Sequence, residues 1–440
     1  MQTKHHIDMT SEIPFWNRWD ELKLIRQAVG KSGFGYFSGR RRIGKTALLR
    51  RVTEEFGGFY HQAVEGTPQQ QLVHLAEEIS AVIPIFKEVI PKTWPEFFSL
   101  LSREKLPPLL VFDEFPYWAA GAPAFLSVFQ KWIDHQLPKL KTLVLVSGSS
   151  QTMLYSHFLR YGTPLYGRSS FRLQLLPMSY AWFCKVLKLK SHADRSFMRF
   201  SWVGGVPHYW KLIPKRAFLR QVEELYFLPS ALLAEEPTHW LRDEGVSGNL
   251  PKALLDLIGR GVTKPSELAS RLGTAQSNLS RSLALLLELG FICKQIPFGE
   301  SMRSSKKVLY SIQDEALSFY YGTYLRYRAE WPRFSMIERL RILGEHAARH
   351  WEDFCRCRFP GAARYWEGDV EIDLVAPRAK KKMLVAECKW ARLTPRTEQR
   401  LLGDLRARFE STRLANKFRR KYTVEFRIFS KKDVGALTNG

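Results

Sequence analysis

The spacing of hydrophobic residues changes character several times along this chain. Short apolar runs precede Gly39 and Asp113, and others fill residues 142–146 and 171–176. Their length predicts buried strands of a parallel sheet. Between about Pro177 and Trp240 the apolar and aromatic residues recur with helical spacing instead. The first half of the chain is therefore expected to hold an α/β domain followed by a helical bundle.

Residues 246–330 carry three amphipathic helical segments with short turns, and Pro265 opens the second segment. A basic hairpin from Phe291 to Tyr310 follows, so we expect a winged helix-turn-helix. Its polar positions would meet base edges and phosphates in a DNA reader; they are Gln276, Ser277, Asn278 and Arg281 on the third helix and Arg303, Lys306 and Lys307 on the wing. The alternative is a rigid adaptor, because this motif specifies docking geometry and not a target.

Residues 370–390 alternate between apolar and polar positions, as a β-hairpin does. The alternation predicts that Val370, Ile372 and Leu374 share one face and that Glu371 and Asp373 share the other. On the second strand the polar face holds Val385, Glu387 and Lys389. Asp373, Glu387 and Lys389 are thus expected to gather on one face, although a solvated face of paired charges has the same pattern.

The segment "GYFSGRRRIGKTALLR" matches G-x-x-x-x-G-K-[ST] between an apolar run and helix-forming residues. That context is typical of a phosphate loop, whose backbone amides and helix N-terminus face the phosphates of a nucleotide. Lys45 is expected to reach the β- and γ-phosphates, and the Thr46 hydroxyl to bind Mg²⁺. The nucleotide-binding residues predicted in this loop are Gly39, Arg40, Arg41, Arg42, Ile43, Gly44, Lys45 and Thr46.

Further candidates for the nucleotide site follow the other predicted strands. Asp113 and Glu114 end the run "PPLLVFDEF", where Asp113 would hold the Mg²⁺ shell and Glu114 would polarise the attacking water. Ser149 follows the strand at 142–146 and could sense the γ-phosphate, although turn chemistry explains its Ser-Gly-Ser-Ser run almost as well. Arg168 could act as an arginine finger in cis or in trans, or lie on the surface.

An ordered set of motifs in residues 12–330 resembles the archaeal-type P-loop ATPases, relatives of the AAA+ and signal-transduction ATPases. The set comprises "FWNRWDEL", "GRRRIGKTALL", "VFDEF", "SGSS", "PLYGR" and "GGVPHYW". The resemblance implies a P-loop NTPase core over residues 1–176 and a helical lid over 177–245. It also makes Gly205 and Pro207 candidates for covering the nucleotide, beside a plain helix-entry turn.

The C-terminal residues 335–440 resemble the PD-(D/E)xK restriction-endonuclease-like fold. The resemblance rests on Glu352 in a predicted helix, then Asp373, then Glu387-x-Lys389 across the hairpin. The sequence departs from the family pattern by having Ile-Asp where the family name has Pro-Asp. The two hairpin carboxylates, the Cys388 carbonyl and water suit Mg²⁺ or Mn²⁺, with Glu352 as a further carboxylate and Lys389 stabilising the scissile phosphate.

Charge and composition narrow the range of partners. The chain has 440 residues, 67 Lys and Arg against 43 Asp and Glu, and a net charge of +24, which favours nucleic acid over neutral metabolites. Basic residues dominate from Arg378 onward, although a solvated basic face would look the same. No pair of the five cysteines has the spacing of zinc ligands, so a zinc finger is not expected. Because neither a signal peptide nor a membrane span is expected, we predict a cytoplasmic protein that does not bind membranes.

Two functions from different classes remain open. The first is an ATP-hydrolysing protein that engages DNA and cleaves it through a C-terminal Mg²⁺-dependent site. The second is a regulatory ATP switch whose winged helix and C-terminal domain bind nucleic acid or protein without cleavage. A plain transcription factor is weaker, because regulators seldom need a complete hydrolytic set. A homo-oligomer is a further possibility, since an arginine finger can act in trans.

Overall fold

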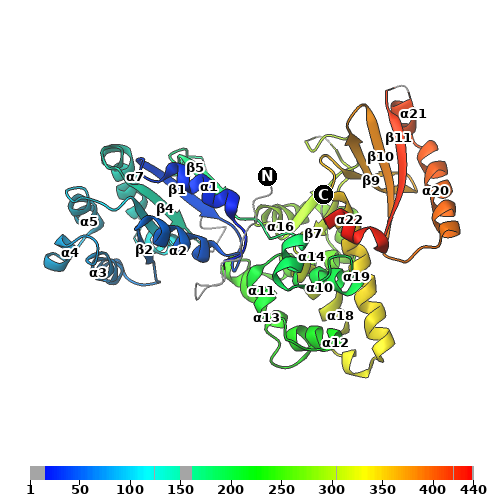
Figure 1. Ribbon diagram of the computed structural model, residues 1–440, viewed down its shortest axis with the longest axis horizontal. Coiled ribbons are helices and arrows are strands. Elements are labelled where there is room, and N and C mark those ends of the chain that lie inside the picture. The colour runs from blue at the N-terminus through cyan, green and yellow to red at the C-terminus, as the bar shows by residue number, and fades with distance from the viewer. Residues whose placement is uncertain (1–14, 123, 149–160, 304, 420, 439–440) are drawn as a thin grey trace. The chain divides into compact units, whose positions relative to one another are not determined.

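The computed structural model describes residues 15–438 except 123, 149–160, 304 and 420. Contacts divide the chain into two compact units (Figure 1). Unit 1 holds the chain up to Pro177 together with Asp243–Gly245, and unit 2 holds Met178–Arg242 and Val246–Gly440.

Unit 1 is built on a five-stranded sheet in the order β2-β3-β4-β1-β5, in which every neighbouring pair is parallel. The strands are β1 (Gly33–Ser38), β2 (Phe59–Gln62), β3 (Leu109–Asp113), β4 (Leu143–Ser147) and β5 (Phe171–Gln174). Strands β3 and β4 are buried at every position, as their uninterrupted apolar runs require. The predicted parallel α/β domain is confirmed.

The helices of unit 1 that follow β2 share one aromatic-rich core with the sheet, in which Trp94, Trp118, Phe125 and Phe129 pack together. Thr67 and Gln70 form a capping box on α3, and Thr93 caps α5. The helices are α1 (Trp19–Ala28), α2 (Lys45–Phe56), α3 (Pro68–Ile79), α4 (Ile85–Glu88), α5 (Trp94–Leu101), α6 (Pro116–Gly121) and α7 (Phe125–His135).

Unit 2 begins with short helices, as the helical spacing predicted. They are α9 (Tyr180–Val186), α10 (Asp194–Val203), α11 (Pro207–Lys211), α12 (Phe218–Val222) and α13 (Leu232–Asp243). Next come α14 (Asn249–Gly259), α15 (Pro265–Arg271) and α16 (Gln276–Glu288), then the antiparallel pair β6 (Ile292–Gln295) and β7 (Leu309–Ile312). These elements share one apolar core with α17 (Glu315–Phe319).

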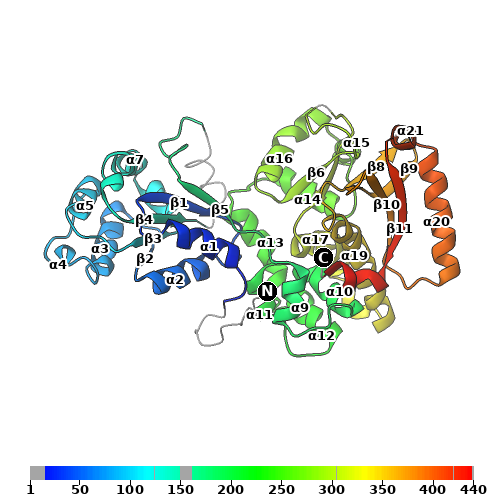
Figure 2. The same ribbon diagram turned by 45° about the horizontal axis from the view of Figure 1, so that its top comes forward.

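The C-terminal part of unit 2 is a four-stranded sheet in the order β11-β10-β9-β8. Strands β8 (Ala363–Glu367), β9 (Val370–Arg378) and β10 (Lys382–Lys389) form an antiparallel meander, and β11 (Thr423–Ser430) returns parallel to β10. The long helix α19 (Met336–Arg356) contacts β9 and β10, and α20 (Pro395–Glu410) contacts β9 and β11. The two helices lie on opposite sides of the sheet (Figures 1 and 2); the short helices α21 (Arg413–Arg419) and α22 (Val434–Thr438) follow.

The predicted alternation of the C-terminal hairpin is interrupted in β9 after Ile372. Ile372 and Val375 lie three positions apart but join the same apolar cluster, and the pairing of β8 with β9 shifts between Ala363 and Tyr365. Strand β10 is buried without interruption from Met383 to Cys388. An extra residue in one strand moves the side chains after it to the opposite face of the sheet. Because helices cover both faces, apolar residues are also buried on both, and the apolar-polar alternation is lost.

The loop after β6 ties the three-helix segment to the C-terminal sheet. The backbone amide of Phe298 donates a hydrogen bond to the Arg364 carbonyl of edge strand β8 over 2.7 Å. The Phe298 ring lies 6.1 Å from the ring of Phe418 in α21. Covering an edge strand removes a row of unpaired backbone groups from solvent. This loop is therefore anchored to protein along part of its length.

Candidate nucleotide site and candidate metal centre

The predicted phosphate loop joins the carboxyl end of β1 to the first residue of α2, Lys45. Gly39 has a φ of 144°, and a Cβ atom added there would lie 2.7 Å from the Leu175 carbonyl oxygen. Only glycine allows this close approach of the loop to the end of β5. The loop thereby curls over the N-terminus of α2, where backbone amides attract anions.

Lys45 lies under this loop with only 6% of its surface exposed. Its Nζ donates to the carbonyls of Gly39 at 2.7 Å and of Arg40 at 3.1 Å. Burial lowers the pKa of Lys45, against the opposing effect of the nearby carboxylates of Glu114 and Asp113. A phosphate offers this buried ammonium a charged partner in place of two neutral carbonyls.

Asp113 ends β3 and collects three hydroxyl donors. Thr46 Oγ1 and Tyr60 Oη donate to its Oδ2 over 2.6 and 2.9 Å, and Ser147 Oγ donates to Oδ1. The sequence predicted Thr46 beside Asp113 but missed Tyr60 and Ser147. The predicted sensor, Ser149, lies outside the described residues. Ser147 could have been found as the first hydroxyl of the same Ser-Gly-Ser-Ser run, at the end of the strand next to β3.

Glu114 adopts a left-handed backbone conformation with φ 53°, which is uncommon for a residue other than glycine. Its amide donates to Asp113 Oδ1 over 3.0 Å, which holds this geometry. Strained backbone of this kind clusters at active sites. Glu114 thus leaves the carboxyl end of β3 in a defined direction, next to Asp113.

Arg18 is a residue of this site that the sequence reasoning missed. It lies in the "FWNRWDEL" motif just before α1, and only 5% of its surface is exposed. Its Nη2 donates to the Ile43 carbonyl at 3.0 Å and to the Leu176 carbonyl at 2.9 Å, while Nη1 pairs with Glu21 at 3.1 Å. Arg18 therefore braces the phosphate loop against the segment after β5.

We expect Arg18→Met to lower the free energy of unfolding of unit 1 by about 2 to 4 kcal/mol, because it removes a buried ion pair and leaves two carbonyls without their donor. Chemical denaturation followed by fluorescence measures this. Arg26→Met is the matched control, since Arg26 makes an exposed ion pair with Glu55 at 2.7 Å and should change stability by less than about 1 kcal/mol. Equal effects of the two substitutions would contradict a bracing role for Arg18.

Arg168 does not lie near the phosphate loop of its own chain. Ser170 pairs with Phe34 near the beginning of β1, whereas the loop follows the end of that strand, about 15 Å away along β1. Arg168 donates to Asp134 Oδ1 over 2.8 Å and to the Pro164 carbonyl over 2.7 Å. The predicted role in cis is therefore wrong, because parallel strands put the start and the end of β1 at opposite edges of the sheet.

Gly205 and Pro207 belong to unit 2, where both have local structural roles. The Gly205 carbonyl accepts a hydrogen bond from the Met178 amide over 2.7 Å, and Pro207 is the first residue of α11. Their proposed contact with a nucleotide stays a prediction.

Two of the C-terminal carboxylates lie on neighbouring strands, Asp373 in the first half of β9 and Glu387 near the end of β10. Asp373 accepts a hydrogen bond from the Cys388 amide over 2.8 Å, and Glu387 pairs with Lys389 at 2.7 Å and with Arg408 of α20. Burial and the neighbouring Asp373 raise the pKa of Glu352 to about 7. Burial and Glu387 raise the pKa of Asp373, whereas Lys389 and Arg408 outweigh burial and lower the pKa of Glu387.

This donor set fits an oxygen-liganded divalent cation in part. The negative charges of Glu352 and Asp373 repel each other, and a bound cation would remove this repulsion. In the described part of the chain, however, no group of three His, Cys, Asp or Glu side chains is arranged to hold a metal ion. Arg408 and Lys389 already engage Glu387. The site thus fits a cation held by two carboxylates, backbone and water better than one held by all three carboxylates.

We expect affinity for Mn²⁺ at this site to rise about tenfold between pH 6 and pH 8. The pKa of Glu352 is raised to about 7, so below this pH the carboxyl holds a proton that competes with the cation. As the pH rises and the proton dissociates, the affinity for the metal increases. Isothermal titration of the nucleotide-free protein at several pH values measures the change. Glu352→Gln should abolish the pH dependence, and a flat profile in the wild type would contradict a role for this carboxyl.

The candidate nucleic-acid residues fall into two groups. Gln276, Ser277, Asn278 and Arg281 are exposed on the first turns of α16, although Asn278 also donates to Thr274 Oγ1 over 2.9 Å. Arg303, Lys306 and Lys307 are exposed in the loop between β6 and β7, where Lys307 pairs with Glu300 at 3.6 Å. The loop is also anchored through Phe298, so the exposed face of α16 has fewer contacts with the rest of the protein and is the more accessible of the two for DNA.

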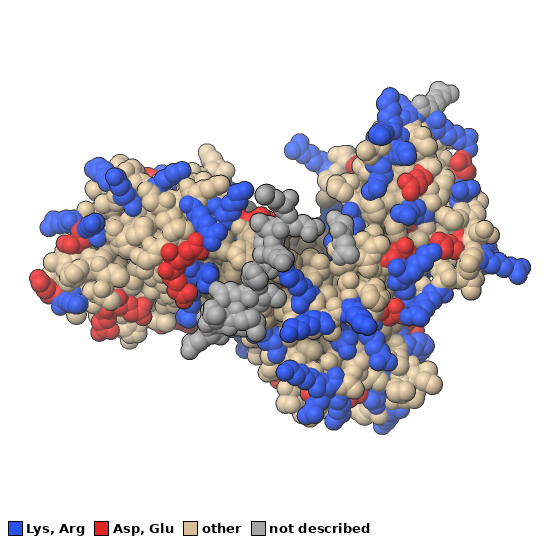
Figure 3. All heavy atoms as spheres, in the orientation of Figure 1, with Lys and Arg blue, Asp and Glu red and all other residues tan. Residues whose placement is uncertain are grey.

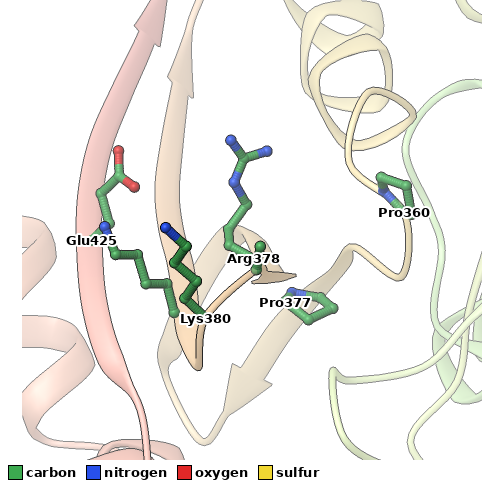
Figure 4. A pocket seen from close by; sticks show the side chains of 7 residues that line it. Pro360, Pro377, Arg378, Lys380 and Glu425 are labelled. Atoms are coloured by element: carbon green, nitrogen blue, oxygen red, sulfur yellow. The ribbon is translucent and has the colours of Figure 1, made fainter.

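The turn between β9 and β10 forms a basic surface at the opposite end of the sheet from the carboxylates. A pocket of about 470 Å³ is lined there by Pro360, Pro377, Arg378, Ala379, Lys380, Lys382 and Glu425. Figure 4 shows the side chains of Arg378 and Lys380 extending in the same direction, with Glu425 on the neighbouring strand. Within the described chain no carboxylate pairs with Lys380, Lys381 or Lys382, and Lys and Arg side chains are frequent at this end (Figure 3).

No helix in the described ranges is both long and apolar enough to cross a membrane.

Comparisons with known proteins match the two ends of the chain separately. Residues 15–211 match an ATPase domain found predominantly in Archaea, and residues 341–401 match a family described as Archaea bacterial proteins of unknown function. The uncharacterized protein MJECL04 of Methanocaldococcus jannaschii is 28% identical over 415 residues, covering 89% of this chain and 91% of that protein. The Walker-type ATPase PABY2304 of Pyrococcus abyssi has a similar fold, with a TM-score of 0.54 at 17% identity, covering 70% of this chain and 96% of that one.

Proposed function

Because residues 15–211 match an archaeal-type ATPase domain, we propose that unit 1 binds ATP with Mg²⁺ and hydrolyses it. One observation carries the proposal: Lys45, Thr46, Asp113 and Glu114 meet where β1 and β3 end. Strands β1 and β3 are parallel members of one sheet, with β4 between them, so their carboxyl ends lie on the same side of the sheet, where such ligands bind. The P-loop fold alone is compatible with nucleotide binding without hydrolysis, so Glu114 carries the hydrolytic part.

Each residue has a defined role in this proposal. Lys45 and the loop amides would bind the phosphates, and Thr46 and Asp113 would hold a Mg²⁺ ion, which would neutralise charge on the phosphates. Glu114 orients the attacking water and accepts its proton. Tyr60 and Ser147 keep the Asp113 carboxylate in one orientation through their hydroxyls.

For the C-terminal domain we propose metal-dependent cleavage of DNA. A helix, an antiparallel meander, a second helix and a parallel strand support the resemblance to restriction-endonuclease-like domains. Asp373 with Glu352 or Glu387 would hold Mg²⁺, and Mn²⁺ would serve as a substitute. Lys389 would stabilise the scissile phosphate. Its Nζ lies 2.7 Å from Glu387 Oε1, and all three carboxylates raise its pKa, which keeps it positively charged.

The alternative is a regulatory ATP switch without cleavage. Two observations favour it: Lys389 and Arg408 neutralise Glu387, and the loop that would form the wing is held on β8 through Phe298. In this reading the three-helix segment is an adaptor, and the C-terminal domain binds nucleic acid or protein. Loss of cleavage without loss of binding distinguishes the two functions.

If the C-terminal domain binds DNA, replacing Lys380, Lys381 and Lys382 together by alanine should weaken binding equally for all sequences. The exposed turn carries these lysines, and each phosphate contact contributes about 0.9 to the slope of log K against log salt, so the slope should fall by up to about 3. Fluorescence anisotropy with duplex DNA at several salt concentrations measures the slope.

The matched control replaces three exposed lysines of unit 1, Lys87, Lys92 and Lys105, and removes the same charge. It should leave the slope nearly unchanged. Equal slopes for both triple variants would exclude the hairpin as the phosphate-binding surface.

A further inference from the structure

Three consecutive residues, Asp243–Gly245, belong to unit 1 although Arg242 and Val246 on either side belong to unit 2. We name this segment the acidic strap, since it contains Asp243 and Glu244. It includes the last residue of α13 and precedes α14, which begins at Asn249. The chain therefore returns to the unit that holds the phosphate loop for three residues, immediately before the three-helix segment.

One carboxylate of the strap pairs with a cation of the phosphate loop, and the other is close enough to affect the charge of Lys45. Asp243 Oδ2 forms an ion pair with Arg41 Nη1. Glu244 is buried, with 3% of its surface exposed, and its charge opposes the effect of burial on the pKa of Lys45. The strap thus places one negative charge on Arg41 and a second within electrostatic range of Lys45, and both cations are predicted to bind the phosphates of ATP.

We propose that the acidic strap competes with the phosphates of ATP for Arg41 and Lys45, so that nucleotide binding displaces it. The inference rests on the proposed binding of ATP at this loop. Like charges repel strongly where water is largely excluded, and a buried Glu244 beside Lys45 raises the cost of bringing a triphosphate there. The competition is reciprocal, because any group that weakens ATP binding must itself be released by ATP.

Displacement of the strap would change the conformation of the chain segment between α13 and α14. Gly245 has a φ of 67°, a conformation that glycine adopts without strain, so the chain can change direction directly after Glu244. Residues 246–248 then lead into α14. Release of Asp243 and Glu244 would free the connection that precedes the three-helix segment and report the nucleotide state to it.

The test is the affinity of the full-length protein for a fluorescent ATP analogue with Mg²⁺, measured by equilibrium titration. Glu244→Gln and Asp243→Asn should each bind it more tightly, by about tenfold for Glu244→Gln, a typical size for coupling between two linked sites. Asp256→Asn removes the same charge from an ion pair with Arg260 on α14 and should bind like the wild type.

Hydrogen exchange of the peptide that spans residues 240–250 gives a second, independent measurement. Saturating Mg²⁺-ATP should accelerate its exchange in the wild type and have little further effect in Glu244→Gln. Unchanged or weaker affinity in both strap variants, or exchange that ATP does not accelerate, would overturn the competition while leaving ATP binding intact. Failure of the wild type to bind the analogue would instead overturn the proposed function, and the inference with it.

Discussion

Glu114→Gln is expected to slow ATP hydrolysis by a factor of about 10² to 10⁴, the usual contribution of a general base, while ATP binding is retained. Glutamine keeps the size of the side chain but cannot accept a proton from the attacking water. The hydrogen bond from the residue 114 amide to Asp113 involves only backbone on that side, so the local geometry should survive the substitution. Single-turnover phosphate release and equilibrium nucleotide binding measure the two effects separately.

Two controls sharpen this experiment. Glu77→Gln changes an exposed glutamate of α3 and should hydrolyse ATP at the wild-type rate. Lys45→Ala should have the opposite signature, with loss of nucleotide binding itself, because it removes the buried ammonium of the phosphate loop. A Glu114→Gln protein that hydrolyses ATP as fast as the wild type would assign the base to another residue.

If the C-terminal domain cleaves DNA as proposed, the wild-type protein should nick supercoiled plasmid with Mg²⁺ or Mn²⁺, and Glu387→Ala should slow this nicking at least about a hundredfold. Glu387 is the carboxylate that links Lys389 on its own strand to Arg408 on α20, so its removal frees the cation proposed to face the phosphate and takes away one candidate metal ligand. Gel electrophoresis of the plasmid, with time, measures the rate.

Glu425→Ala is the matched control, because Glu425 lies on β11 of the same sheet but lines the pocket at its other end. It should nick like the wild type. If the wild type cuts with neither metal, in the presence or absence of ATP, cleavage is excluded and the regulatory switch becomes the better description.

The nucleotide site was accessible from sequence because its chemistry is local. The phosphate loop is eight consecutive residues, and Asp113 and Glu114 end a strand that its apolar run identifies. Arg18 was not accessible, although its motif was noticed, because its partners Ile43 and Leu176 lie 25 and 158 residues away. Tyr60 and Ser147 join Asp113 only through the order β2-β3-β4, which no local pattern contains.

The C-terminal site shows a different limit. Its three carboxylates and Lys389 follow one another along the sequence in the predicted order, and the structure brings Asp373, Glu387 and Lys389 together as the alternation predicted. The sequence does not show that Arg408 of α20 reaches Glu387, because this contact depends on how α20 packs on the sheet. The pKa of Glu352, about 7, likewise depends on burial and on the approach of Asp373, neither of which has a sequence signature.

Sequence alone determined the parallel α/β core, the phosphate loop, the Asp-Glu pair after β3 and the basic character of the C-terminal part, because each depends on residue type and short-range spacing. Only the tertiary structure decided that Arg168 lies at the wrong edge of the sheet to act in cis and that Arg18 braces the loop. It also decided that Asp243 and Glu244 return to the phosphate loop. These contacts join residues far apart in the chain, and chain folding, not local periodicity, sets such distances.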